Sequence, residues 1–118
     1  SSDVDDVLLW IFAGCETANT HSTYGNLVNM ATTKGVDCVI GYSDVTYWPT
    51  TYTTSSGNRF FKEFWYWSAG MGETVQQAHD IALQNLWAIE HNHWGFDTVV
   101  ISGEVGGSVV IKPAHYGS

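Results

Sequence analysis

At 118 residues the chain has room for a single domain at most, or part of one, and its net charge of −8 makes it strongly acidic. Four lysines and arginines against twelve aspartates and glutamates leave no basic patch for nucleic acid or an anionic membrane. No apolar run is long enough to cross a bilayer. The abundant Ser, Thr, Asn, Tyr and Gly favour an extracellular or cell-surface location, and a cytoplasmic location is the alternative.

The first predicted element is a strand over residues 7–13. It begins at Val7, ends at Ala13 and is continuously apolar, which is typical of a strand covered on both faces. Apolar residues at helical spacing then predict a helix over residues 24–34, and a second strand follows over residues 36–42. The order strand, helix, strand predicts a βαβ unit with two adjacent parallel strands.

Residues 43–57 read as a long polar loop, a length that usually signals a functional or mobile segment. A short helix is predicted over residues 58–68, with Asn58 as its N-cap. This helix is richer in aromatic side chains than one amphipathic face needs. Either it is buried on two sides or it meets another domain or subunit. The aromatic residues concerned are Phe60, Phe61, Phe64, Trp65 and Trp67.

The longest predicted helix covers residues 75–91 and begins with a capping box formed by Thr74 and Gln77. Its predicted inner face consists of Val75, Ala78, Ala82, Leu86 and Ile89. A third strand is predicted over residues 97–102. The dipeptide Gly106-Gly107 suits a tight turn, so we expect the chain to return through residues 109–111 as a C-terminal hairpin.

The two cysteines, Cys15 and Cys38, are predicted to be free thiols. Cys15 follows the first strand and Cys38 begins the second, so parallel strands place them at opposite ends of the sheet, roughly 15 Å apart. A disulfide requires Cα atoms within about 7 Å of each other. Cys15 follows an apolar strand at the edge where open α/β sheets bind ligands, which suits a reactive thiol.

Residues 12–18, Phe-Ala-Gly-Cys-Glu-Thr-Ala, resemble the nucleophile motif of CHAT domains, which are caspase-like (clan CD) cysteine peptidases. Residues 35–41, Gly-Val-Asp-Cys-Val-Ile-Gly, resemble the second strand of that family. The aromatic segment 60–67 followed by residues 73–83 resembles its helix pair. The resemblance extends over about residues 7–90.

This resemblance implies the carboxyl half of a caspase-like three-layer α/β/α sandwich, with parallel strands and a C-terminal hairpin, forming one partial domain over residues 1–118. It implies a cysteine endopeptidase in which Cys15 is the nucleophile of a Cys–His dyad. The backbone N–H groups of Gly14 and Cys15 would form the oxyanion hole. The family histidine lies on the strand before the nucleophile, and no histidine precedes Cys15 here. Either that histidine lies upstream of this chain or the dyad is incomplete.

The resemblance also implies that the segment after the second strand binds substrate by strand addition. Asp44 would select a basic residue by a charge-assisted hydrogen bond. The substrate-binding residues are then Ser43, Asp44, Val45, Tyr47 and Trp48. No cofactor and no metal is implied.

None of the five histidines present offers an obvious replacement for the family base. His21 and His115 read as loop and tail residues, and His79 as a boundary residue beside the apolar stripe of the long helix. His91 and His93 lack nearby carboxylate or cysteine partners with metal-ligand spacing.

The alternative to a peptidase is a non-catalytic α/β module for self-association or ligand binding on a surface protein. In either case the apolar edge of residues 7–13 predicts a cover, because a bare apolar edge strand aggregates. That cover would be an upstream segment, a second chain or another copy of this chain.

Overall fold

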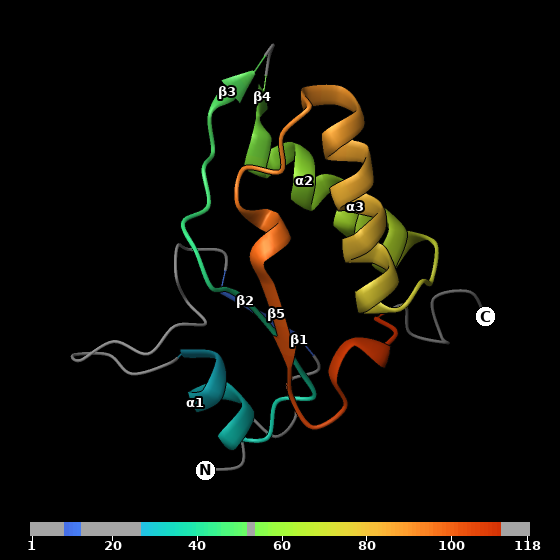
Figure 1. The fold of residues 1–118 in the computed structure, drawn as a ribbon. Helices are drawn as coiled ribbons and strands as arrows, with labels where there is room; N and C mark the ends of the chain where they lie inside the picture. The colour runs from blue at the N-terminus through green and yellow to red at the C-terminus, as the bar shows by residue number, and fades with distance from the viewer. Residues whose placement is uncertain (1–8, 13–26, 52–53, 112–118) are drawn as a thin grey trace. The chain divides into compact units, whose positions relative to one another are not determined.

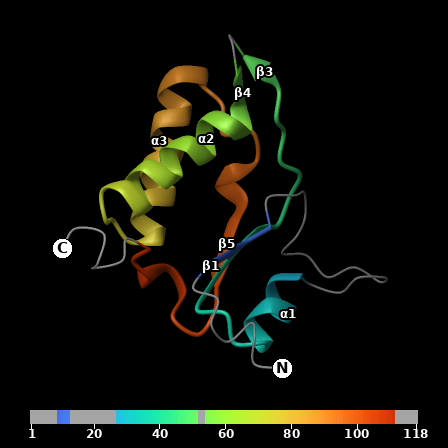
Figure 2. The same ribbon diagram turned by 180° about the vertical axis from the view of Figure 1, so that it is seen from behind.

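The computed structural model describes residues 9–12, 27–51 and 54–111. The chain divides into two compact units. Unit 1 comprises Ser1–Thr46 and Gly95–Val109, and unit 2 comprises Tyr47–Trp94 and Val110–Ser118. The described residues form a mixed α/β structure whose elements are labelled in Figure 1 and seen from behind in Figure 2. No helix in the described part is long and apolar enough to cross a membrane.

Unit 1 is built on a three-stranded sheet in the order β1-β2-β5. Strand β1 (Leu9–Ile11) pairs in parallel with β2 (Cys38–Tyr42), with Leu9 opposite Cys38 and Ile11 opposite Ile40. The predicted parallel, adjacent pair is therefore confirmed. Strand β5 (Val99–Ser102) runs antiparallel to β2, so the sheet is mixed rather than parallel throughout.

The central strand β2 is the fully buried element of this sheet. All five of its residues are buried, whereas Leu9 and Ile11 of β1 are half-buried and Trp10 is 37% exposed. The expectation that the first strand is covered on both faces is wrong for its described part. The reason is position: β2 has a strand on each side, and β1 lies at one end of the strand order.

Helix α1 (Leu27–Thr33) connects the two parallel strands and packs against β2 and β5. It ends as predicted at Gly35, whose positive φ of 93° lets the chain turn back. The amide N–H groups of Gly35 and Val36 donate to the carbonyls of Thr32 and Ala31, at 3.0 and 3.4 Å. Val28, Ala31, Val36 and Val39 form a buried cluster beneath the helix, and Phe12 packs against it.

The predicted C-terminal hairpin is wrong. After β5 the amides of Val105 and Gly106 both donate to the carbonyl of Asp37 at 2.8 Å, which turns the chain away from β5. Residues Gly106–Ser108 form a short 3₁₀ helix instead of a two-residue turn. Long-range hydrogen bonds to the turn before β2 therefore override the local preference of the Gly-Gly pair. In unit 2, Val110 forms an isolated antiparallel bridge with Thr74.

Unit 2 contains two helices that pack against each other, α2 (Ser56–Trp65) and α3 (Val75–Glu90). Helix α2 begins earlier than predicted, because the Ser55 side chain, not that of Asn58, is the N-cap and accepts from the Asn58 amide at 3.1 Å. A π-helical turn, Tyr66–Gly70, continues it. Just before α2, strands β3 (Thr50–Thr51) and β4 (Thr54–Ser55) form a small antiparallel pair inside the predicted loop.

The aromatic side chains of α2 divide by face. Phe60 and Phe64 are buried against α3, Phe61 and Trp67 are half-buried, and Trp65 is 43% exposed. Burial on two sides is therefore wrong for this helix. It is amphipathic, and its outer face keeps exposed aromatic surface.

Helix α3 begins with the predicted capping box. The Gln77 amide donates to the Thr74 hydroxyl and the Gln77 side chain accepts from the Thr74 amide, each at 3.1 Å. Val75, Ala78, Ala82 and Leu86 are buried as predicted, but Ile89 is 45% exposed. The buried stripe instead includes His79, four residues after Val75, and Glu90, four residues after Leu86.

Candidate functional site at the carboxyl ends of β1 and β2

The parallel pairing of β1 and β2 brings the carboxyl ends of both strands to one edge of the sheet. Beyond Ile11 the ladder continues for one residue, since the Phe12 amide donates to the Ile40 carbonyl at 2.8 Å. The chain leaves β2 at Ser43 and Asp44, on this same edge. In open α/β sheets this is the edge where ligands bind.

The segment after β2 is held in place by residues 95–98 of unit 1. The Ser43 amide donates to the Thr98 carbonyl at 3.0 Å, and the Asp44 amide is 3.3 Å from the Thr98 hydroxyl. Gly95, with φ of 89°, lies so close to Val45 that a Cβ there would be 2.0 Å from the Val45 carbonyl oxygen. Residue 95 must therefore be glycine, and the backbone of Ser43–Thr46 is positioned by these contacts.

Asp44, the predicted selector of a basic group, is exposed on a turn. Its Oδ1 accepts from the Val45 amide at 2.7 Å. Within the described residues no group is bonded to its second carboxylate oxygen. The carboxylate lies at the surface of this edge, where a cation can reach it, rather than at the base of an enclosed cavity.

The other predicted substrate-binding residues, Tyr47 and Trp48, belong to unit 2. Trp48 lies against Gly57, where a Cβ would be 2.0 Å from the indole ring, and it stacks on Phe61 with ring centroids 5.8 Å apart. One side of the indole is thus fixed while 41% of the residue stays exposed, and Tyr47 is 56% exposed. The predicted binding segment therefore divides between the two units after Thr46.

Cys38 is a free and fully buried thiol at the start of β2. Burial, with a smaller contribution from the neighbouring Asp37 charge, raises its pKa to about 12. The reactive form of a cysteine is the thiolate, so Cys38 is chemically inert in the folded protein. Cys15 and Gly14, the predicted nucleophile and oxyanion residues, lie outside the described residues, as do His21 and His115.

His79 is a core residue of unit 2 rather than the predicted boundary residue, since none of it is exposed. Its ring lies edge-on to Phe60 and Phe64, with centroids 4.9 and 6.1 Å away. Desolvation lowers its pKa to about 4, because this apolar setting disfavours the charged imidazole. His79 is thus enclosed, neutral and out of reach of a substrate.

The two remaining described histidines flank the exposed Trp87 near the end of α3. Their ring centroids lie 6.0 Å (His91) and 5.2 Å (His93) from the Trp87 rings. None of the three histidines in the described part belongs to unit 1, which carries β1 and β2. Within the same residues no three His, Cys, Asp or Glu side chains are grouped to hold a metal ion.

Sequence reasoning missed a buried carboxylate, Glu90, which joins the two helices of unit 2. The Arg59 Nε atom is 2.8 Å from one Glu90 oxygen, and the side chain of Glu90 is only 2% exposed. The other oxygen accepts from the Ser56 hydroxyl and from the Trp94 indole N–H, the latter at 2.8 Å. Each oxygen of the Glu90 carboxylate accepts a hydrogen bond. This buried charge therefore stabilises the contact between the two helices and does not act as a catalytic acid.

At the level of class, the described residues define a mixed α/β protein with a parallel strand pair and a polar loop at its carboxyl edge. The chain matches no family model, and neither curated proteins nor solved structures provide a match.

Proposed function

We propose that this chain is the nucleophile-bearing part of a caspase-like cysteine endopeptidase, with Cys15 as the nucleophile and its partner histidine contributed from upstream. The observation that carries the proposal is the parallel, adjacent pairing of β1 and β2. Cys15 follows Phe12 by three residues, at most about 11 Å of extended chain. The proposal therefore puts Cys15 near the sheet edge from which Ser43 and Asp44 leave β2.

In the proposed reaction the Cys15 thiolate attacks the carbonyl carbon of the scissile peptide bond. The C–N bond then breaks, and the imidazolium gives its proton to the leaving amine. Water hydrolyses the resulting thioester and restores the thiol. Backbone N–H groups at Gly14 and Cys15 would stabilise the oxyanion, and the exposed carboxylate of Asp44 supports cleavage after a basic residue.

The buried state of Cys38 makes a sharp test possible. In the native whole protein, iodoacetamide should alkylate Cys15 with an apparent pKa below the value of about 8.5 for a free cysteine. Cys38, with its raised pKa of about 12, should react only after unfolding in urea. Peptide mass spectrometry reads each site separately, and Cys15→Ser is the control for assignment. A Cys15 pH profile that is identical in native and unfolded protein contradicts the nucleophile assignment.

Two affinity labels extend the same experiment to specificity. A lysyl chloromethyl ketone should modify Cys15 faster than the leucyl analogue, and Asp44→Asn should remove that preference. Glu104→Gln, which changes another exposed carboxylate of unit 1, is the matched control. Equal rates for both labels in the unsubstituted protein would contradict selection of a basic residue.

The second candidate is a non-catalytic module for self-association or ligand binding. The observation that favours it is that the described part of unit 1, which carries β1 and β2, contains no histidine. Slow, equal alkylation of Cys15 and a solvent-exposed model thiol would support this candidate over the peptidase.

A further inference from the structure

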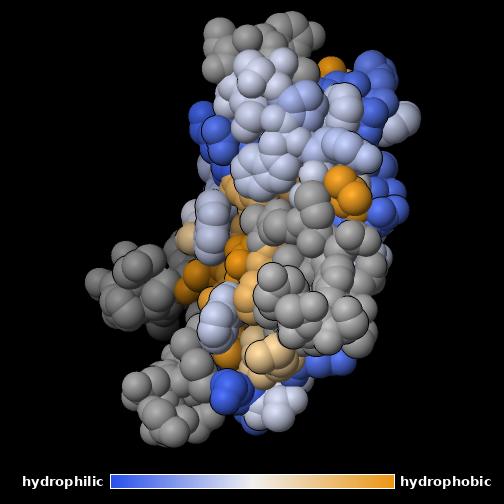
Figure 3. Space-filling model, turned by 90° about the vertical axis from the view of Figure 1, so that its left-hand side faces the viewer, coloured by the Kyte–Doolittle hydropathy of each residue, from blue (hydrophilic) through white to orange (hydrophobic). Residues whose placement is uncertain are grey.

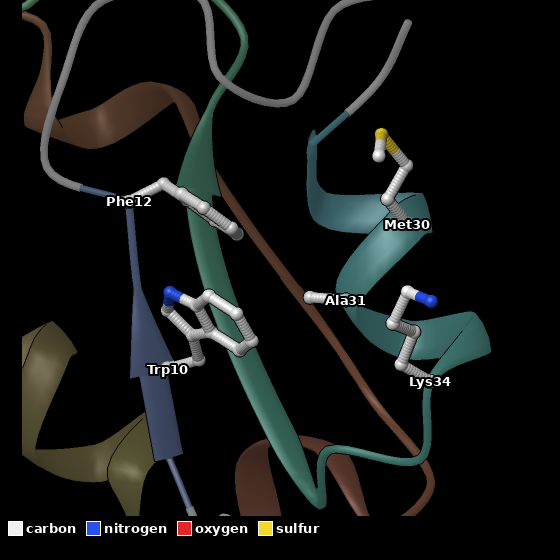
Figure 4. A pocket seen from close by; sticks show the side chains of 5 residues that line it. All are labelled: Trp10, Phe12, Met30, Ala31 and Lys34. Carbon is white, nitrogen blue, oxygen red and sulfur yellow. The ribbon is translucent and has the colours of Figure 1, made fainter. Parts of the chain in front are cut away.

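A small pocket opens between the edge strand and the helix of unit 1, with a volume of about 190 Å³. Figure 4 shows the rings of Trp10 and Phe12 projecting from β1 toward α1, and the methyl group of Ala31 facing them. Met30 and Lys34 of α1 also line the pocket. The Trp10 and Phe12 rings are stacked, with centroids 5.4 Å apart and an interplanar angle of 24°.

The size and walls of this pocket fit one aromatic ring. An apolar protein cavity of about 150 Å³ holds a benzene molecule, so this one has room for a ring with a short substituent. Its walls are aromatic rings, a methyl group, a thioether and the aliphatic part of a lysine, all of which favour an apolar guest. Trp10 and Met30 are 37% and 50% exposed, and the surface view in Figure 3 also shows apolar surface open to solvent.

The charge beside the pocket indicates what that substituent is. Lys34 is the single lysine or arginine in the sequence of unit 1, which is otherwise acidic. Among the described residues it forms no ion pair. In Figure 4 the Lys34 nitrogen is turned away from the Trp10 and Phe12 rings, and the long flexible stem of this exposed lysine lets the ammonium group swing to the mouth of the pocket while its carbons cover apolar surface. In a chain of net charge −8, this is a local point of attraction for an anion on a surface that otherwise repels one.

We propose that this pocket binds a small aromatic carboxylate, with the ring between Trp10, Phe12 and Ala31 and the carboxylate paired with Lys34. The site uses none of the residues proposed for catalysis or peptide binding. It is therefore a separate ligand site on unit 1, independent of the peptidase proposal.

Phenylacetate is a suitable probe, because it joins a benzene ring to a carboxylate through one carbon. We expect a dissociation constant of millimolar order, the usual limit for a ligand of this size. Titration of the ¹⁵N-labelled protein should shift the Trp10 indole N–H signal, which the Trp10→Phe variant assigns. Phenethylamine, with the same ring and opposite charge, should bind more weakly.

Substitution of the lysine separates the charge from the apolar walls. Lys34→Gln should raise the dissociation constant of phenylacetate about two- to five-fold, as expected for an exposed ion pair, and leave that of neutral benzyl alcohol unchanged. Lys62→Gln, which removes another exposed lysine, from α2, is the matched control and should change neither dissociation constant.

Any one of the following outcomes would overturn the proposal. The first is that the Trp10 signal does not move at saturating phenylacetate. The second is that the Lys34→Gln and Lys62→Gln proteins bind phenylacetate equally. The third is that phenethylamine binds as well as phenylacetate. Binding of a phenylalanine-containing peptide without binding of phenylacetate would also overturn it and would instead indicate a polypeptide partner. Lys34 is exposed, so its substitution leaves the fold intact and each result interpretable.

Discussion

Burial sets the protonation state of Cys38 and His79, two ionisable residues with no exposed surface. For Cys38 it disfavours the thiolate, and for His79 it disfavours the imidazolium, so both side chains stay neutral at physiological pH. Neither effect is visible in the sequence. Cys38 stands in an apolar run and was expected to be a free thiol, but its inertness follows from the two strands that flank β2.

The lowered pKa of His79 predicts acid-sensitive stability. In the unfolded chain the imidazole binds a proton near pH 6.5, whereas in the folded protein it does so only near pH 4. The unfolded state therefore binds more protons between these values, and the free energy of unfolding falls as pH drops from 6.5 to 4. A shift of this size corresponds to at most about 3 kcal/mol.

Urea unfolding followed by tryptophan fluorescence, at pH 7.5 and at pH 4.5, measures this dependence. His79→Leu should lower the pH dependence of the unfolding free energy, whatever its effect on stability at neutral pH. His91→Gln, which changes an exposed histidine beside the same helix, should leave the pH dependence as it is. If the His79→Leu and unsubstituted proteins lose equal stability on acidification, His79 is not the group responsible.

At the scale of elements, α2 and α3 are held together by apolar contacts and by the ion pair and hydrogen bonds of Glu90. Phe60 and Phe64 of α2 lie edge-on to His79 of α3, and all three side chains are buried. Glu90 receives hydrogen bonds from Ser56 at the start of α2 and from Arg59 one turn later. The carboxylate therefore ties the beginning of one helix to the end of the other.

Glu90→Gln should destabilise unit 2 strongly. The amide keeps the shape but leaves Arg59 without its counter-charge and places an N–H₂ group where a donor already points. Breaking a buried ion pair by changing one partner typically costs about 3–5 kcal/mol; because Arg59 is 21% exposed, we expect the lower end of this range. Chemical denaturation measures the loss, and Asp80→Asn on the exposed side of α3 should change little. Equal stability of the two variants would contradict the stabilising role of Glu90.

Some features of helix α3 could be predicted from local sequence patterns. The capping box of Thr74 and Gln77 was predictable because its hydrogen bonds join residues three apart. The buried face of α3 could be predicted only at the positions where its residues are apolar. At its end the buried position belongs to Glu90 rather than Ile89, because a hydrophobic pattern does not select a charged residue whose partners lie elsewhere in the chain.

At the scale of the whole molecule, the position of β1 at one end of the strand order favours association with another chain. Within the described sheet it has a neighbour on one side only, and Trp10 in its centre is 37% exposed. An apolar edge strand is a template for pairing with another chain. The predicted cover of residues 7–13 therefore stays a prediction.

We expect the 118-residue chain on its own to self-associate through this edge. Size-exclusion chromatography with light scattering should show a mass that rises with concentration. Trp10→Lys should suppress association, because a charged side chain on an edge strand disfavours pairing. Val105→Lys, which changes an exposed apolar residue outside the strands of the sheet, is the control for a general gain in solubility. A monomer at all concentrations would contradict this expectation.

The sequence by itself determined the features that depend on residues near one another in the chain. These are the strand–helix–strand order with its parallel pair, the glycine stop of α1, and the capped start and apolar stripe of α3. The motif around Cys15 and the loop from Ser43 to Trp48 also came from sequence alone, and the peptidase remains a proposal built on them.

Only the tertiary structure decided the antiparallel course of β5, the loss of the expected hairpin, and the burial of His79 and Glu90. Each depends on a partner far away in sequence. The Asp37 carbonyl accepts from the amides that a hairpin would need. The Glu90 carboxylate is paired with Arg59 and accepts from the Ser56 hydroxyl, both more than thirty residues earlier in the chain. Local preferences are worth about 1 kcal/mol or less per residue, so long-range hydrogen bonds and burial override them wherever the two disagree.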